Sequence, residues 1–160
     1  TPSEAGLITD AKAAFDFIHG QSGAQGNDSV ILPVGAYAHS LGTGVAIHLA
    51  KERDVSALVL ESPFDSLLAV AQRRLSWLPV EWLLRHPFRS DEIISDLDVP
   101  ILIMHGNRDQ VIPIDHGRAL ANKAGDDARF VLVKGAGHNN LESHGTIERA
   151  VDFFAAQFAN

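Results

Sequence analysis

Ser40 lies in a sequence context that could make it a nucleophile. An apolar run over 30–37 leads towards Ser40, and small residues within an apolar helical pattern follow it, among them Gly42 and Gly44. A strand that turns sharply into a helix at a serine strains the serine backbone and leaves its oxygen exposed above the sheet edge. That oxygen also lies at the positive end of the helix. The segment therefore indicates a nucleophile elbow.

The small residues around Ser40 depart from the usual elbow pattern by one methyl group. Glycine usually stands two residues before and two residues after the serine, so that strand and helix can approach each other. Here Ala38 takes the first position and Gly42 the second. A serine between small residues is also typical of an ordinary turn or a helix N-cap. The enzyme interpretation therefore needs an acid and a histidine later in the chain.

Both residues follow, each directly after a run that is typical of a buried strand. The run 99–104 leads into a polar loop with Asp109, and the run 129–133 leads into a glycine-containing loop with His138. A serine hydroxyl is a weak nucleophile, so it needs a base such as His138 to accept its proton and later return it to the leaving group. Asp109 would hold the imidazole tautomer. The order serine, aspartate, histidine predicts a catalytic triad.

Together these motifs resemble the alpha/beta-hydrolase superfamily, and most closely its small serine hydrolases of the abhydrolase domain-containing and serine-aminopeptidase-like branch. The resemblance covers nearly the whole chain, and the segments that match most clearly lie at 1–7, 39–46, 61–67, 105–113 and 137–139. The resemblance implies a carboxylesterase-like serine hydrolase that cleaves an ester, thioester or amide through an acyl-enzyme on Ser40. It implies a small-molecule acyl substrate and no cofactor.

The resemblance leaves the identity of the acid open between Asp109 and two earlier carboxylates. Some relatives carry the acid after the strand that here ends near Glu61, which makes Glu61 and Asp65 alternatives. We favour Asp109, because the loop from His105 to Asp109 follows the family pattern closely.

The resemblance also implies an oxyanion hole with the backbone amide of Leu41 as one donor. The second donor normally comes from a loop after an earlier strand, and the resemblance begins at Thr1, at a point that follows the fourth strand in relatives. We therefore expect a sheet that lacks its N-terminal strands, and possible self-association through the exposed edge of the strand before Ser40. An incomplete hydrolase-fold fragment that acts as a binding or interaction module is the alternative function.

These residues must be positioned by strands that alternate with helices. We expect four strands, over 30–38, 55–60, 99–104 and 129–133. Helical patterns separate them, which predicts an α/β fold with a parallel sheet covered on both faces, in a single domain over 1–160. The first strand contains Pro33 and Gly35, and proline removes a ladder hydrogen bond, so this strand is either shortened or bulged.

The segment 77–96 between the second and third strands is a candidate cap. It carries Trp77, Trp82 and Phe88. One interpretation is a helical excursion packed on the body, and the other is a short lid whose apolar side contributes to the substrate pocket. We include these three aromatic residues, and His39 beside the nucleophile, as candidates for lining that pocket.

The composition of the chain argues against several other classes of function. The formal net charge is −7 with no basic cluster, which argues against nucleic acid and anionic membranes as partners. Without cysteine the chain has no disulfide or thiolate metal site, and its histidines have no metal-motif spacing, so we expect no metal. No apolar run approaches the length of a membrane helix and no signal peptide is visible. The compartment is open, and a soluble, cytoplasmic protein is favoured.

Overall fold

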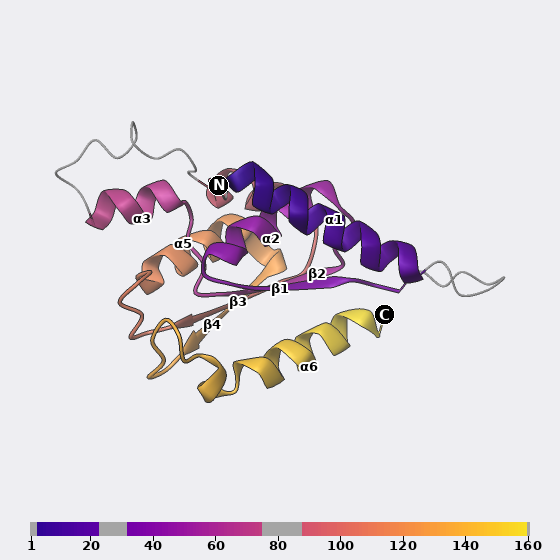
Figure 1. The fold of residues 1–160 in the computed structure, drawn as a ribbon. Helices are drawn as coiled ribbons and strands as arrows, with labels where there is room; N and C mark the ends of the chain where they lie inside the picture. The colour runs from indigo at the N-terminus through magenta and orange to yellow at the C-terminus, as the bar shows by residue number, and fades with distance from the viewer. Residues whose placement is uncertain (1–2, 23–31, 75–87, 160) are drawn as a thin grey trace.

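The computed structural model describes residues 3–22, 32–74 and 88–159. Its centre is a parallel sheet of four strands in the order β1-β2-β3-β4. The strands are β1 Gly35–His39, β2 Ala57–Glu61, β3 Ile101–Gly106 and β4 Ala128–Val133. Because the strands are parallel and follow one another in the sheet, all four end at the same edge, where Figure 1 shows the connecting loops gathered.

Helices cover both faces of this sheet (Figure 1). They are α1 Glu4–Ser22, α2 Leu41–Glu52, α3 Leu67–Arg74, α5 Ile114–Ala124 and α6 Thr146–Phe158. Short 3₁₀ turns lie at Ser90–Glu92, Ile94–Asp96, Gly125–Asp127 and Glu142–His144. α1, α2 and α5 lie on one face, and α6 lies on the other. The predicted α/β fold with a parallel sheet between helices is confirmed.

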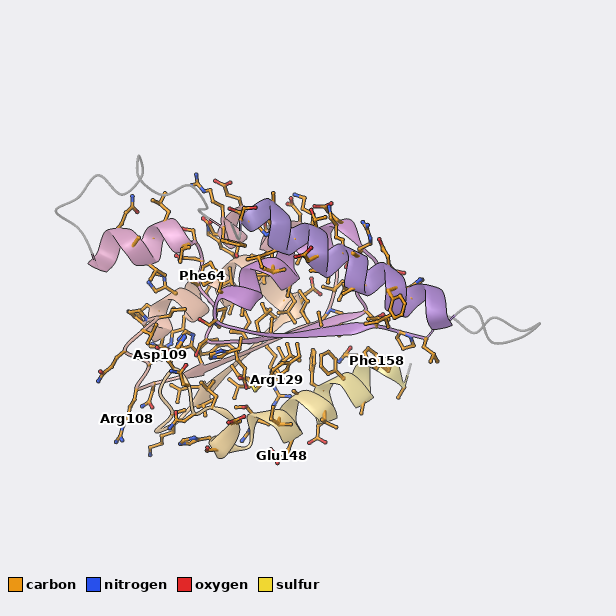
Figure 2. The ribbon with its side chains drawn as sticks, in the orientation of Figure 1. Phe64, Arg108, Asp109, Arg129, Glu148 and Phe158 are labelled. Carbon is orange, nitrogen blue, oxygen red and sulfur yellow. The ribbon has the colours of Figure 1, made fainter. Side chains whose placement is uncertain are left out.

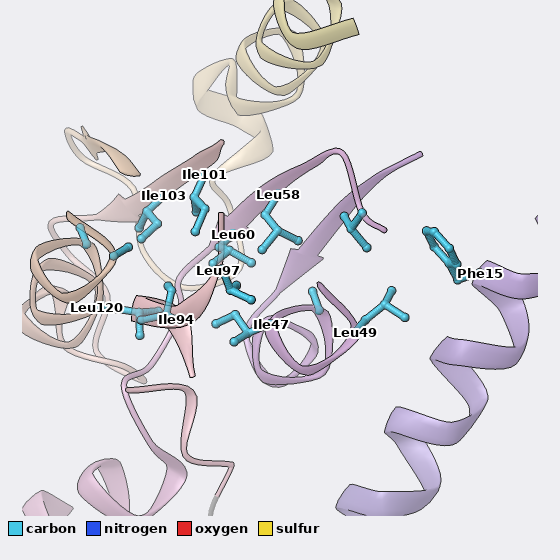
Figure 3. Packing of buried hydrophobic residues seen from close by; sticks show 14 residues of the cluster. Phe15, Ile47, Leu49, Leu58, Leu60, Ile94, Leu97, Ile101, Ile103 and Leu120 are labelled. Carbon is cyan, nitrogen blue, oxygen red and sulfur yellow. The ribbon is translucent and has the colours of Figure 1, made fainter. Parts of the chain in front are cut away.

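The two central strands are buried on both faces, as the continuous apolar runs predict. Alternate side chains of β2 and β3 point to opposite faces, so Leu58 and Leu60 pack towards α2 while Val59 packs towards α6. On the α2 face, Ile47 and Ile103 join a cluster that reaches from Phe15 of α1 to Leu120 of α5 (Figure 3). This two-sided core fixes the sheet edge on which the candidate site is built.

The first strand is shorter than the predicted 30–38, and the two possibilities left open by Pro33 are resolved in favour of a shortened strand. β1 begins only at Gly35, because a proline before it cannot donate to the ladder. A Cβ atom at Gly35 would lie 2.4 Å from the Phe154 ring of α6. Glycine at this position therefore lets α6 pack directly against the strand that precedes Ser40.

β1 forms one edge of the sheet that the structure describes. Leu32 before it is 57% exposed and Tyr37 within it is 41% exposed. Of the candidate cap 77–96, the part up to residue 87, with Trp77 and Trp82, lies outside the described residues. The described part packs on the body, where Ile94 is fully buried. None of the helices in the described ranges is long and apolar enough to cross a membrane.

Candidate active site

Ser40 occupies a strained turn between β1 and α2. Its backbone has φ 54° and ψ −122°, in a region that non-glycine residues rarely adopt. The Thr43 amide and hydroxyl donate hydrogen bonds to the Ser40 carbonyl at 3.0 and 2.6 Å. A Cβ atom at Gly42 would still be 3.7 Å from the Ala38 methyl group. The alanine in place of the usual glycine is therefore accommodated without a clash.

His138 connects Ser40 to Asp109 through its two ring nitrogens. Its Nδ1 lies 2.8 Å from Asp109 Oδ2, and its Nε2 lies 2.9 Å from Ser40 Oγ. A carboxylate can only accept hydrogen bonds, so Nδ1 carries the proton, and Nε2 is free to accept a hydrogen bond from the serine hydroxyl. The structure thus brings the three predicted residues into one continuous chain of hydrogen bonds, from positions 98 and 29 residues apart.

The Asp109 side chain is fully buried and surrounded by donors. Its Oδ1 accepts the backbone amides of Val111 and Ile112, each at 2.8 Å. Burial raises the pKa of Asp109, but His105 Nε2 at 3.4 Å and the hydrogen bonds from His138 and the Ile112 amide outweigh burial and hold this pKa well below its usual range. The carboxylate is therefore ionised and able to stabilise a positive charge on His138.

Backbone contacts join the loops that carry Asp109 and His138. Arg108 N donates to Ala136 O at 2.9 Å, and Asn107 Oδ1 accepts the Gly135 amide at 2.7 Å. A Cβ atom at Gly106 would lie only 2.3 Å from Ala136 O. Glycine at the end of β3 therefore permits the close approach that places the histidine loop beside the aspartate loop.

The alternative acids have other partners. Asp65 Oδ1 accepts His116 Nδ1 at 2.8 Å and the Ser66 amide at 2.7 Å. Glu61, at the end of β2, is hydrogen-bonded to the hydroxyl of Tyr37. Burial and the hydrogen bond to Glu61 raise the pKa of Tyr37. The structure brings Asp109, rather than either of these carboxylates, to His138.

A largely apolar cavity of about 260 Å³ opens beside Ser40. It is lined by Ser40, Leu41, Phe64, Leu67, Val70, Val111 and Ile112. Phe88, which we expected in the pocket, is 2% exposed and packs behind Phe64 with ring centroids 6.5 Å apart. In Figure 2, Phe64 and Asp109 lie towards the same end of the molecule, away from Phe158.

The sequence reasoning did not identify the apolar residues of this cavity. Leu67 and Val70 are three residues apart on α3 and therefore share a helix face. Val111 and Ile112 come directly after the aspartate loop, where two adjacent apolar residues do not by themselves indicate a cavity. The i, i+3 spacing on α3 was an available signal, but it is equally typical of core packing.

His39 and Leu41, the neighbours of Ser40, lie on different sides of it. His39 lines a second cavity of about 380 Å³, which also contains Tyr37, Glu61 and His138. Leu41 is 43% exposed and begins α2, so its amide has no carbonyl four residues earlier within the helix. A larger cavity, of about 560 Å³, lies near the amino ends of β3 and β4 and is remote from Ser40.

We find no metal site in the part of the chain that the structure describes. There, no three histidine or carboxylate side chains converge as ligands would. The polar groups around Ser40 are engaged with one another, and the cavity beside it is lined mainly by carbon.

Comparison with known proteins places this geometry in a family. The family model Abhydrolase 4, described as TAP-like protein, matches residues 71–157, which is more than half of the chain. The chain is 38% identical over 141 residues to the uncharacterized protein Rv2307c of Mycobacterium tuberculosis, covering 88% of this chain and 48% of that one. It is 35% identical over 148 residues to lysophosphatidylserine lipase ABHD12 of Rattus norvegicus, and the match covers 81% of this chain and 35% of that one.

The solved structures agree with this assignment at the level of the fold. The esterase domain of a Rhodothermus marinus protein superposes with a TM-score of 0.68 at 19% identity, covering 96% of this chain and 70% of that one. The chain spans about half or less of the length of the two curated relatives. On the family match, the sequence relatives and the fold, this chain belongs to the alpha/beta-hydrolase superfamily.

Proposed function

We propose that this protein is a serine hydrolase that cleaves a carboxylic ester through an acyl-enzyme on Ser40, with His138 as the base and Asp109 as the acid. One observation carries the proposal: the unbroken hydrogen-bond chain from Ser40 Oγ through His138 to the buried, ionised Asp109. A nucleophile in contact with a base that is itself oriented by a third group is the arrangement that activates serine.

In the acylation step, Ser40 Oγ attacks the substrate carbonyl carbon while His138 Nε2 takes the hydroxyl proton. The imidazolium that forms is stabilised by Asp109, whose Oδ2 lies 2.8 Å from His138 Nδ1. The tetrahedral oxyanion is stabilised by the Leu41 amide at the start of α2, where the helix dipole also favours negative charge. Collapse of this intermediate breaks the ester bond, and His138 gives its proton to the departing alcohol.

Deacylation repeats these steps with water. His138 removes a proton from the attacking water, the acyl group leaves as a carboxylic acid, and Ser40 recovers its proton. Ester substrates are favoured over amides because an alkoxide leaves more readily and demands less from the site. A second oxyanion donor would add to the Leu41 amide, since the loss of one donor typically costs roughly 10²–10³ in turnover.

The cavity beside Ser40 suggests which end of the substrate is apolar. Leu41, Phe64, Leu67, Val70 and Ile112 make a site for a hydrocarbon chain. A volume of about 260 Å³ suits a short acyl group. The name of one relative, a lysophosphatidylserine lipase, is consistent with an ester that carries an acyl chain.

Labelling with a fluorophosphonate probe tests the proposal. The unaltered protein should react covalently at residue 40, and Ser40→Ala should lose labelling while its fold is kept, because this partly exposed hydroxyl contributes little to the core. His138→Ala should lower labelling about as much, since members of a triad act as a unit. A panel of p-nitrophenyl esters of increasing chain length then measures turnover.

Two results would contradict the proposal. Ester turnover by Ser40→Ala at the rate of the unaltered protein would remove the nucleophile assignment. Absence of both labelling and turnover in the folded protein would favour the alternative of a hydrolase-fold binding module.

A further inference from the structure

His105 is a buried histidine for which the proposed reaction so far has no role. It lies near the end of β3, and its side chain is fully buried. Its Nε2 lies 2.9 Å from the carbonyl oxygen of Ile112 and 3.4 Å from Asp109 Oδ2. The imidazole thus reaches the oxygen of Asp109 that also contacts His138.

The surroundings of His105 determine which nitrogen carries its proton. Both neighbours of Nε2 are oxygen acceptors, so Nε2 must be the donor. Nδ1 is buried and has no hydrogen-bond partner among the described residues. A proton there would leave a buried donor unsatisfied, which costs free energy. His105 Nε2–H is therefore donated to Ile112 O at 2.9 Å, and Asp109 Oδ2 lies 3.4 Å from the same nitrogen.

Helix α5 holds the ring in this position. A Cβ atom at Gly117 would lie 2.4 Å from His105 Nδ1 and 3.3 Å from Cγ. The ring is therefore seated directly against the backbone of α5, and glycine at 117 makes the space that it occupies. Because the ring fills this space, it cannot move away from Asp109 without displacing the helix.

The two oxygens of Asp109 are held from different directions. The amides of Val111 and Ile112 donate to Oδ1 at 2.8 Å each. Oδ2 faces the two imidazoles of His138 and His105. Without a donor at His105, Oδ2 would be held only by His138, the residue that the carboxylate itself has to orient.

We propose that His105 is a positioning residue for the reaction, whose Nε2–H fixes the Asp109 carboxylate in the plane from which Oδ2 accepts His138 Nδ1–H. This inference rests on the proposed hydrolase function, because it assigns His105 a task within that site. The ring does not touch Ser40, and it acts only through Asp109.

Two substitutions at His105 distinguish the effect of its hydrogen-bond donor from the effect of its side-chain volume. The amide nitrogen of Gln can take the place of Nε2, whereas Leu fills similar space with no donor. We expect His105→Leu to lower kcat by roughly tenfold with KM little changed, and to raise the pKa of Asp109 by about one unit, as the loss of one hydrogen bond to a charged group predicts. His105→Gln should keep kcat and the pKa of Asp109 close to their values in the unaltered protein. The pKa is read from the carboxyl ¹³C signal of Asp109 in labelled protein.

A substitution on α5 tests the same contact without altering either partner. Gly117→Ala places a methyl group where His105 Nδ1 now lies, so it should displace the ring and reproduce the effects of His105→Leu. Gly20→Ala is the matched control, because a Cβ atom at that helical glycine meets nothing within 4 Å. Circular dichroism checks that each variant is folded.

The outcomes separate this inference from the proposed function. An Asp109 titration and turnover unchanged in both His105→Leu and Gly117→Ala would overturn the role of His105. If His105→Leu does not fold, Gly117→Ala decides alone. If the unaltered protein hydrolyses no ester, the proposed function fails, and the Asp109 titration still shows whether His105 holds the carboxylate.

Discussion

The imidazole of His39 is hydrogen-bonded to the backbone of His138: its Nε2 lies 2.8 Å from the His138 carbonyl oxygen, although the two residues are 99 positions apart in the chain. The two rings lie 5.0 Å apart between centroids. His39 directly precedes Ser40, so this contact connects the strand that carries the proposed nucleophile to the loop that carries the proposed base. The position of His138 relative to Ser40 therefore depends on a second contact besides their own hydrogen bond.

The first prediction concerns this contact. His39→Phe keeps an aromatic ring but removes the donor, so the His138 loop should lose one of its attachments. We expect a roughly ten- to hundredfold lower kcat for ester hydrolysis, since small displacements of catalytic groups have effects of this size. His39→Gln, which can donate from a similar position, should retain most activity. Equal losses in both variants would show that the donor is not what matters.

The second prediction distinguishes the two aspartates. Asp109→Asn should lower kcat by about 10⁴-fold, because an amide favours the wrong tautomer of the proposed base. Asp65→Asn is the matched control, since Asp65 is bonded to His116. It should change turnover less than about tenfold and act mainly on stability. Initial rates on a single p-nitrophenyl ester compare the variants, and the reverse order of activities would identify Asp65 as the acid.

The sequence predicted the fold and the position of the candidate site through the same signal. Apolar runs located the strands, and parallel strands must end at one edge, so polar residues directly after them were expected to meet there. Asp109 and His138 illustrate this reasoning, because each follows its strand by only a few residues.

The sequence could not show which polar residues at this edge become partners. Asp65 and Asp109 both follow strands, and only the packing of α5 places His116 rather than His138 beside Asp65. Phe88 looked like a pocket residue because it is aromatic and lies within the candidate cap, yet apolar patterns do not distinguish a cavity wall from the layer behind it. The start of β1 was ambiguous for a local reason, because Pro33 interrupts the run.

The third prediction concerns the cavity beside Ser40. Val70→Phe adds bulk to the wall of a space of about 260 Å³. We expect kcat/KM to fall severalfold for longer acyl esters and to change little for acetate esters, because only the longer chains would meet the new ring. Val151→Phe is the control, since Val151 lies on α6 and is 60% exposed. A uniform loss of kcat/KM over all acyl chain lengths would indicate that the acyl chain binds elsewhere.

The fourth prediction follows from the lowered pKa of Asp109. A carboxyl whose pKa is lower in the folded than in the unfolded protein contributes stability above its unfolded value, near 3.9, and this is lost as the pH falls through the folded value. The unfolding free energy of the unaltered protein should therefore exceed that of Asp109→Asn above about pH 4, and the difference should shrink as the pH falls below about 4. Urea titrations measure the difference, and one that grows as the pH falls below about 4 would contradict the lowered pKa of Asp109.

The fifth prediction concerns β1 at the edge of the described sheet. Backbone groups on a strand edge can pair with a second chain, and Leu32 and Tyr37 expose apolar surface there. We expect light scattering to show concentration-dependent self-association. Leu32→Lys should weaken it, because a charge beside the edge opposes pairing, while the exposed Phe17→Lys on α1 should not. A monomer at every concentration would exclude this use of the edge.

The strained backbone conformation of Ser40 lowers the stability of the protein at the residue that the proposed activity requires. A serine held at a φ of 54° costs on the order of 1–3 kcal/mol relative to a relaxed residue. Glycine adopts that conformation without strain, so Ser40→Gly should be more stable than the unaltered chain while losing the proposed nucleophile. A library selected for thermal stability alone would therefore drift towards inactive proteins at this position, and selection for stabilised variants needs turnover as a second criterion.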